Sequence, residues 1–240
     1  MKARASDPAG VRSMQNGWRL GISAGDSRHY RFSQLDDYFG IPRRKFPHRS
    51  LTLSLRARAS GTSISGTWGF GLWNDPFGLS IGFGGAPFQL PALPNAIWFF
   101  HASRHNYLSF TGDKPAQGFL AQVFRSPRFH RLLVLAGAAF PFSRKATRRL
   151  LARVIAEDSV ALNLDITEWH RYKIEWSPQR SAFWVDESPV FETAVSPRPP
   201  LGLVIWIDNQ YAAFSPEGKI SFGVLEGKEE WLEIEGLEIK

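Results

Sequence analysis

Residues 165–186 read DITEWHRYKIEWSPQRSAFWVD. Within them, His170–Trp176 alternates polar residues with bulky apolar ones, which is the two-residue period of a strand that buries one face. Ser177–Arg180 has the composition of a turn, and Ser181–Val185 is again apolar and aromatic. The stretch therefore predicts an antiparallel hairpin, and Val190–Thr193 is expected to continue it as a third strand.

Strand patterns extend outward from this hairpin in both directions. Leu51–Arg58 alternates in the same way. In Thr67–Trp73 glycines alternate with bulky residues, which favours a strand that another part of the molecule approaches closely. Leu201–Ile207 is apolar enough to be a central strand with both faces buried. The remaining expected strands are Asn95–Ala102 and Tyr107–Thr111, joined by a turn at Ser103–Asn106, and then Ile220–Leu225 and Trp231–Ile239. Turn residues at intervals of roughly 8–12 residues predict an all-β fold, an antiparallel β-sandwich.

One stretch departs from the strand pattern. Pro127–Ala139 and Arg144–Ala156 have helical spacing, and Pro141 separates them. The second segment has an apolar stripe of Leu150, Leu151, Val154 and Ile155. We therefore expect one domain over residues 1–240 with a helical insertion at residues 126–157. The insertion is open to three interpretations: a lid over a groove, a membrane contact, or helices packed on a sheet edge.

The composition excludes several classes of site. The 240 residues include no cysteine, which excludes disulfides, thiolate zinc sites, iron–sulfur ligation and a cysteine nucleophile. The longest nearly apolar run, Leu132–Phe142, is about half of the roughly 20 residues that span a membrane. The first 30 residues have charged side chains and no apolar segment, so no signal peptide is predicted and a cytoplasmic location is the default expectation.

The net charge of +7 is unevenly distributed. Residues 125–156 have eight basic residues and no acidic one, whereas residues 157–240 have 16 acidic and seven basic residues. A basic balance can indicate nucleic acid, an anionic membrane or an acidic partner. The sequence has no zinc-finger spacing, RNP-like motif or glycine-rich phosphate loop, so nucleic acid is not the expected partner.

The hairpin at residues 165–186 resembles the concanavalin A-like lectin/glucanase superfamily and is most similar to glycoside hydrolase family 16, which has a W-H-x-Y-x-I-E-W-x-P…F-Y-V-D-G hairpin at this place. Leu53–Arg58 followed by Gly71–Trp73 is similar to that family's E-A-R…G-x-W-P-A-F-W-L strands, and Leu232–Lys240 resembles its closing strand. The resemblance covers about half of the chain in separate pieces. It implies a concanavalin A-like jelly roll, a curved two-sheet sandwich whose concave face is a sugar-binding groove.

The resemblance also implies a catalytic strand that this chain lacks. In the family, an E-x-D-x-x-E strand supplies the nucleophile and the general acid/base, and retaining hydrolysis needs two such carboxyl groups about 5–5.5 Å apart. No Asp or Glu occurs between Asp75 and Asp113, and the strand that corresponds best reads NAIWFFH over residues 95–101. The closest acidic cluster, Glu229, Glu230, Glu233 and Glu235, is expected to face solvent on the last strand. The family's two-carboxylate mechanism is therefore not expected.

Two polar and aromatic clusters are candidates for a ligand site. Sugar rings stack their apolar faces on aromatic rings, while their hydroxyls need amide or carboxylate partners. The first cluster is Trp73, Asn74 and Asp75, with Trp98 and His101 from the next expected strand. The second is Trp206, Asp208, Asn209, Gln210 and Tyr211. In the structural alternative, Trp98 fills the core, and Asp75 and the second cluster only form turns.

Three functions are compatible with these observations. The first is a degenerate glucanase-like protein that binds a carbohydrate or glycoconjugate in an aromatic concave groove, without retaining hydrolysis. The second is a glycoside hydrolase-like enzyme with relocated acids, for which Asp75, Asp208 and His101 are the catalytic candidates. The third is a lipid or apolar-ligand module whose insertion contacts an anionic lipid surface through Arg144, Lys145, Arg148, Arg149 and Arg153. No metal or cofactor is expected, because no carboxylate accompanies the histidines in sequence.

Overall fold

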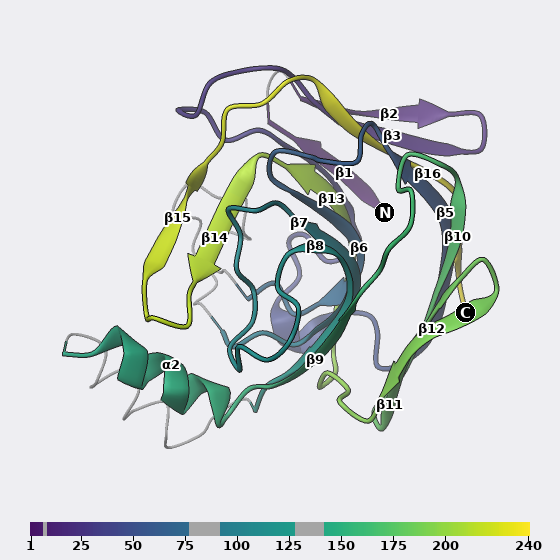
Figure 1. Ribbon diagram of the computed structural model, residues 1–240. Coiled ribbons are helices and arrows are strands. Elements are labelled where there is room, and N and C mark those ends of the chain that lie inside the picture. The colour runs from purple at the N-terminus through teal and green to yellow at the C-terminus, as the bar shows by residue number, and fades with distance from the viewer. Residues whose placement is uncertain (7–8, 77–91, 128–141) are drawn as a thin grey trace.

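The computed structural model of the chain describes residues 1–6, 9–76, 92–127 and 142–240. Within these residues, two seven-stranded antiparallel sheets curve around a common core (Figure 1). We call one the cavity sheet; its order is β1 (Lys2–Ala5), β4 (Phe32–Asp36), β13 (Gly202–Asp208), β6 (Thr67–Trp73), β7 (Ala96–Ala102), β8 (Gly118–Arg125) and β9 (Ala156–Ala161). The other, the back sheet, has the order β12 (Ser188–Thr193), β11 (Arg180–Val185), β10 (His170–Ser177), β5 (Leu51–Ala59), β16 (Glu230–Ile239), β3 (Gly17–Ile22) and β2 (Gly10–Met14). A separate hairpin consists of β14 (Gln210–Phe214) and β15 (Ile220–Val224).

The hairpin predicted from residues 165–186 lies within the back sheet. β10 pairs with β11 on one side and with β5 on the other, so that Ile174 lies opposite both Phe183 and Leu53. Every second residue of β10, beginning with Tyr172, is buried, and the residues between them are partly exposed. The two-residue period of the sequence therefore reflects a sheet with one buried face, and the prediction of an antiparallel β-sandwich is confirmed.

The central strands of the cavity sheet are buried on both faces. All seven residues of β7 are buried. Phe99 belongs to the core between the sheets, whereas Trp98 and Phe100 belong to a second hydrophobic cluster on the opposite face. Leu108, from the segment after β7, and Leu151, from helix α2 (Arg144–Ala152), pack against this second cluster.

Glycines in β6 make room for the second cluster. Pairing places Trp206 of β13 beside Gly69, and Trp98 of β7 beside Gly71. A Cβ atom at Gly69 would lie 2.8 Å from the Trp206 ring, and one at Gly71 would lie 2.7 Å from the Cβ atom of Trp98. Both separations are shorter than van der Waals contact, so the prediction that Thr67–Trp73 is approached closely is confirmed.

The prediction of a strand at Tyr107–Thr111 is wrong. β7 pairs instead with β8, and this segment makes only one isolated bridge, to β14. The backbone N–H groups of Phe110 and Thr111 donate to the carboxylate of Glu157 on β9, at 2.8–3.0 Å. These N–H groups are therefore not available for a strand ladder.

Helix α2 is shorter than the sequence predicts. Ser143 caps its first turn through its side-chain oxygen, and the helix ends at Ala152. The expected end was Ala156, but that residue already pairs with β8 as the first residue of β9. The other expected helix, Pro127–Ala139, falls almost entirely outside the described residues, so it and the bounds 126–157 stay predictions. Among the described helices, none is long and apolar enough to cross a membrane.

Two acids of β16 are buried, so the expectation that the whole acidic cluster faces solvent is wrong. Glu233 is 1% exposed and accepts hydrogen bonds from the guanidinium groups of Arg19 and Arg58 at 2.7 and 2.8 Å. Glu230 accepts from the backbone N–H and the hydroxyl of Ser65. Burying a carboxylate is costly unless it is paired or hydrogen-bonded. Glu233 is both, and Glu230 is hydrogen-bonded.

Candidate ligand-binding cavity

A cavity lies on the face of the cavity sheet that carries the second hydrophobic cluster. Its volume is about 80 Å³. Strands β4, β6, β7 and β13 contribute to it, together with the segment after β7 and hairpin β14–β15. The lining residues are Tyr30, Phe32, Gln34, Thr67, Trp73, Asp75, Trp98, Phe100, Asn106, Leu108, Trp206, Asp208, Gln210, Tyr211 and Ala212.

Four aromatic rings form an apolar floor. Trp73 and Trp206 are parallel within 6°, with ring centroids 6.1 Å apart. Trp98 lies 5.5 Å from Trp206 and 6.0 Å from Trp73, and Phe100 lies 5.8 Å from Trp206. Trp98 and Phe100 share a face because they are two residues apart in one strand. The strand period therefore assembles a continuous aromatic surface from β6, β7 and β13.

Asp208 ends β13 at one edge of this floor. Its Oδ1 accepts hydrogen bonds from the Thr67 hydroxyl at 2.7 Å and the Thr67 N–H at 3.2 Å, and its Oδ2 accepts from the Tyr30 hydroxyl at 3.3 Å. The Trp206 Nε1–H donates to the same Thr67 hydroxyl at 3.0 Å. Burial raises the pKa of Asp208 to about 6, although these hydrogen bonds act in the opposite direction.

Asp75 lies at the other edge, just past the end of β6. It is 2% exposed and has a φ of +46°, in the left-handed region that Asp tolerates better than most residues. The guanidinium of Arg43, in the 3₁₀ turn η1 (Arg43–Lys45), donates to the carbonyl oxygens of Asn74 and Asp75. Burial raises the pKa of the Tyr38 hydroxyl well above its ordinary value, and the Asp75 charge raises it further.

Side-chain amides occupy the remaining wall. Gln34 donates to the carboxylate of Asp36 at 2.9 Å and to the Tyr38 hydroxyl at 3.1 Å. Asn106 accepts from the backbone N–H of Ala212 at 2.9 Å. These contacts fix both amides, so the wall presents oriented polar groups beside the aromatic floor.

Seven of the ten predicted ligand residues line this cavity: Trp73, Asp75, Trp98, Trp206, Asp208, Gln210 and Tyr211. His101 does not, and its assignment to the site is corrected. It stacks on Trp68 at 5.8 Å, on the side of β7 that faces the back sheet, because it is an odd number of residues from Trp98. Burial lowers the pKa of His101 to about 4, so its ring is neutral at neutral pH.

Asn74 and Asn209 also lie outside the cavity lining and stabilise turns. Asn209 is fully buried; its Oδ1 accepts from the Arg31 N–H at 2.8 Å, and its Nδ2 donates to the Leu225 carbonyl at 2.9 Å. The side chain of Asn74 donates to the Leu93 carbonyl and accepts from the backbone N–H of Asn95. Both amide groups are therefore occupied by backbone partners.

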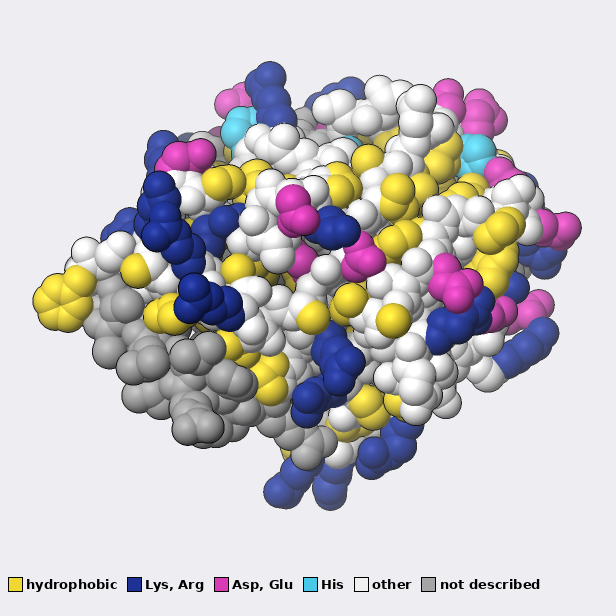
Figure 2. Space-filling model, turned by 60° about the horizontal axis from the view of Figure 1, so that its bottom comes forward, with side chains coloured by type: hydrophobic (Ala, Val, Ile, Leu, Met, Phe, Trp, Pro, Cys, Tyr) yellow, Lys and Arg dark blue, Asp and Glu magenta, His cyan; other side chains and the backbone are white. Residues whose placement is uncertain are grey.

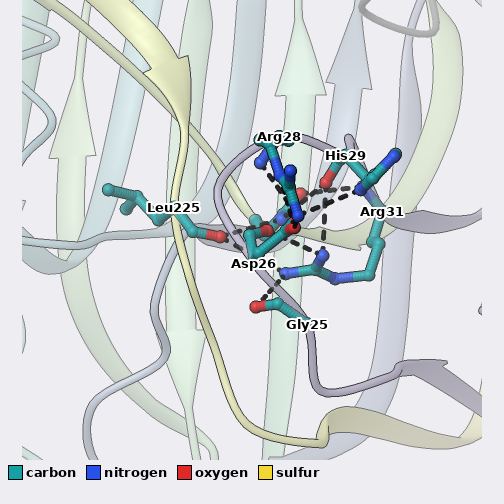
Figure 3. Close-up of polar contacts among 7 residues, drawn as sticks. Gly25, Asp26, Arg28, His29, Arg31 and Leu225 are labelled. Carbon is teal, nitrogen blue, oxygen red and sulfur yellow. Dashed lines mark hydrogen bonds and ion pairs between the residues drawn. The ribbon is translucent and has the colours of Figure 1, made fainter.

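Arg31 fixes the segment that carries Tyr30 (Figure 3). Its side chain is almost fully buried, at 3% exposed for the residue. The guanidinium donates to four backbone carbonyl oxygens, those of Gly25, Asp26, His29 and Leu225. It thereby ties the loop before β4 to the end of hairpin β14–β15, and both elements border the cavity.

Arg148 and Glu157 hold the segment after β7 over the floor. Glu157 accepts hydrogen bonds from the hydroxyls of Ser109 and Thr111 as well as from backbone N–H groups. Arg148 is 6% exposed and donates to the carbonyl oxygens of Ser109 and Phe214. The assignment of Arg148 to a lipid-facing surface is therefore corrected, because its guanidinium points into the protein.

Eight lining residues were not predicted from the sequence: Tyr30, Phe32, Gln34, Thr67, Phe100, Asn106, Leu108 and Ala212. Phe100 and Thr67 had a usable signal, because the two-residue period places them on the same strand faces as Trp98 and Trp73. Tyr30–Gln34 carries no motif, and it reaches the cavity because β4 pairs with the distant strand β13.

No family model and no curated protein matches this chain. Solved structures do. The structure named LamAcat from Zobellia galactanivorans is 13% identical, with a TM-score of 0.51, and the match covers 95% of this chain and 79% of that one. A LamA variant from the same organism, in complex with laminaritriose and laminaritetraose, gives the same TM-score and identity and covers 95% and 80%. A family 16 endo-glucanase from Bacteroides ovatus is 11% identical at a TM-score of 0.49, covering 100% and 94%. At these identities the likeness is one of fold, and the chain has the concanavalin A-like jelly-roll fold.

Proposed function

We propose that the protein binds a carbohydrate or glycoconjugate in the aromatic cavity and does not perform the retaining hydrolysis of family 16. The observation that carries the proposal is the floor of Trp73, Trp98, Phe100 and Trp206, bordered by fixed amide and carboxylate groups. Such a surface accepts the apolar face of a sugar ring while its rim satisfies hydroxyls. The LamA complex with laminari-oligosaccharides supports it, since that protein shares the fold.

The strand that corresponds to the family's catalytic strand supports binding without hydrolysis. β7 contributes Trp98 and Phe100 to the cavity in place of carboxylates. Two carboxyl groups must flank one glycosidic bond, a general acid together with a nucleophile in retaining enzymes or a general base in inverting ones, and they lie within about 10 Å of each other in both. The indole ring of Trp98 and the phenyl ring of Phe100 supply neither a nucleophile nor a general acid.

The relocated-acid hypothesis is less well supported by the geometry. Asp208 lies beside Thr67 at one end of β6, and Asp75 follows Trp73 at the other end. Six extended residues separate these ends by about 20 Å, roughly twice the longest carboxylate spacing of glycosidases. His101, the third candidate, is on the opposite face of the sheet.

Among the described residues, no specific observation favours the lipid hypothesis. Arg148 is buried against carbonyl oxygens. On the face drawn in Figure 2, Lys and Arg side chains lie along the left and lower edges, with hydrophobic and polar side chains between the two groups.

Titration calorimetry against β-glucan and galactan fragments, with a hydrolysis assay on the same panel, tests the proposal. Trp73→Ala should weaken saccharide binding roughly tenfold, because it removes one stacking ring. Trp184→Ala is the matched control: this half-buried tryptophan lies on the outer face of the back sheet, and its loss should leave affinity unchanged. Binding to no saccharide, or equal losses in both variants, would refute the cavity as the site; product formation would refute the absence of hydrolysis.

A further inference from the structure

A second, apolar cleft adjoins the aromatic cavity. It has a volume of about 180 Å³ and is lined by Tyr107, Leu108, Ser109, Phe110, Ala212, Ala213, Phe214, Ile220, Ser221 and Phe222. Leu108 and Ala212 line both spaces, so the two adjoin at these residues.

The hairpin β14–β15 presents an apolar face to this cleft. Ala212 lies opposite Phe222, and Phe214 lies opposite Ile220, in the antiparallel ladder. Opposed residues project to the same face of such a ladder, so these four form one strip. Phe222 is 62% exposed at the outer end of it.

Hydrogen bonds hold the two walls of the cleft together. The Tyr107 N–H donates to the Ala212 carbonyl at 3.0 Å, and the Phe214 N–H donates to the Tyr107 carbonyl at 3.3 Å. The buried Arg148 joins Phe214 to Ser109 across the same region. The cleft is therefore a built feature of the fold.

The chemistry of the cleft differs from that of the cavity. Its lining has no Asp, Glu, Lys, Arg, His, Asn or Gln among the described residues. Ser109 already donates its hydroxyl to Glu157. A further sugar ring would find few partners for its hydroxyls there, whereas a hydrocarbon group would bury apolar surface at no such cost.

We propose that the ligand is a glycoside with a hydrophobic aglycone, whose sugar occupies the aromatic cavity and whose hydrocarbon part occupies the cleft. This rests on the proposed function, since it extends the same site. Because the cavity and the cleft adjoin at Leu108 and Ala212, the bond that links the two parts would pass these two residues.

Paired glycosides test this directly. Methyl, hexyl and phenyl glycosides of glucose, galactose, mannose and N-acetylglucosamine are titrated into the whole chain below the concentration at which they form micelles. Each fully buried methylene strengthens binding about fourfold, so a hexyl glycoside that is only half buried should bind at least about tenfold more tightly than its methyl partner. The hexyl and phenyl arms distinguish a flexible chain from a flat ring, and a gain with either supports the proposal.

Substitutions at the outer end locate the gain. Phe222→Ser should remove most of the hexyl or phenyl advantage and leave methyl glycoside affinity unchanged; because Phe222 is mostly exposed, the variant should fold, as a melting curve would show. Phe142→Ser is the matched control, since that phenylalanine is 90% exposed and does not line the cleft. A hexyl and phenyl affinity equal to methyl, or a gain that survives Phe222→Ser, overturns the inference while the saccharide site stands. Binding of no glycoside at all would instead overturn the proposed function.

Discussion

The two sheets of this molecule are built from similar strands but differ in how many faces they bury. In the back sheet, β10 alternates buried residues with partly exposed ones, and its outer face carries ion pairs such as Arg180 with Glu175. In the cavity sheet, β7 and β13 are buried throughout, because a second aromatic cluster covers the face away from the core. In a two-sheet sandwich the outer face of a sheet is usually exposed. Here the outer face of the cavity sheet is buried, and the cavity lies on that face.

The largest expected effect comes from the glycines beneath the indoles. Gly71→Ala should destabilise the protein by about 3 kcal/mol or more, because the new Cβ would meet the Ile97 carbonyl and the Trp98 backbone at 2.2–2.6 Å. Gly21→Ala in the back sheet is the control: its Cβ would have neighbours only at 3.9 Å. Urea denaturation of both variants measures the difference. Equal stabilities would show that the strands around Gly71 can move enough to accommodate the added methyl group.

The next effect depends on pH. The pKa of Asp208 is raised from 3.8 to about 6 by burial, so the folded state keeps a proton that the unfolded state has already lost. The free energy of unfolding should therefore fall as pH rises from 4 to 7, by at most about 3 kcal/mol from this group. Asp208→Asn should abolish that part of the pH dependence in denaturant titrations, and an unchanged slope would contradict it.

Asp186, in the turn that joins β11 and β12 of the back sheet, should contribute to the pH dependence with the opposite sign. Burial acts to raise its pKa, but hydrogen bonds from His170 and the Arg171 N–H lower it overall. Its contribution to stability is therefore present above its unfolded pKa and is lost as pH falls through the folded one. The Asp186→Asn variant should lose only a small acid-side contribution, because the carboxylate is largely exposed.

An effect of about 2 kcal/mol, smaller than that of Gly71→Ala, is expected for Glu157→Gln. The carboxylate accepts hydrogen bonds from Ser109, Phe110 and Thr111, and an amide leaves some of these donors unsatisfied. Glu175→Gln, an exposed ion-pair partner in the back sheet, should change stability by well under 1 kcal/mol. Thermal melts of the two variants compare them, and similar shifts would mean that Glu157 does not hold the segment over the cavity.

The sequence predicts those elements whose structure depends on neighbouring residues and whose polar and apolar side chains alternate. The hairpin β10–β11 and the strand Thr67–Trp73 follow from alternation and turns alone. The sequence analysis did not predict β9. Glu157 on this strand is satisfied by hydrogen bonds from Thr111, a residue far away in the chain. The same limit applies to the residues that line the cavity. Asp208 comes at the end of an apolar run, and this position led to its prediction as a ligand residue. Gln34 reaches the cavity only because β4 pairs with β13, which is far away in the chain.

The error at His101 has a different cause. Trp98 and His101 are three residues apart in an expected strand, so the period already places them on opposite faces. The structure shows the consequence, with Trp98 in the cavity and His101 against Trp68.

The hydrogen bonds from Trp206 to Thr67 and from Thr67 to Asp208 give the molecule an optical property. An indole one hydroxyl away from a titrating carboxylate experiences a different local field when that carboxylate gains a proton. The emission of Trp206 is therefore expected to change as Asp208 titrates, and a ligand on the floor would change the surroundings of the same ring. The intrinsic fluorescence of the protein should therefore respond both to a ligand bound in the cavity and to the protonation of Asp208.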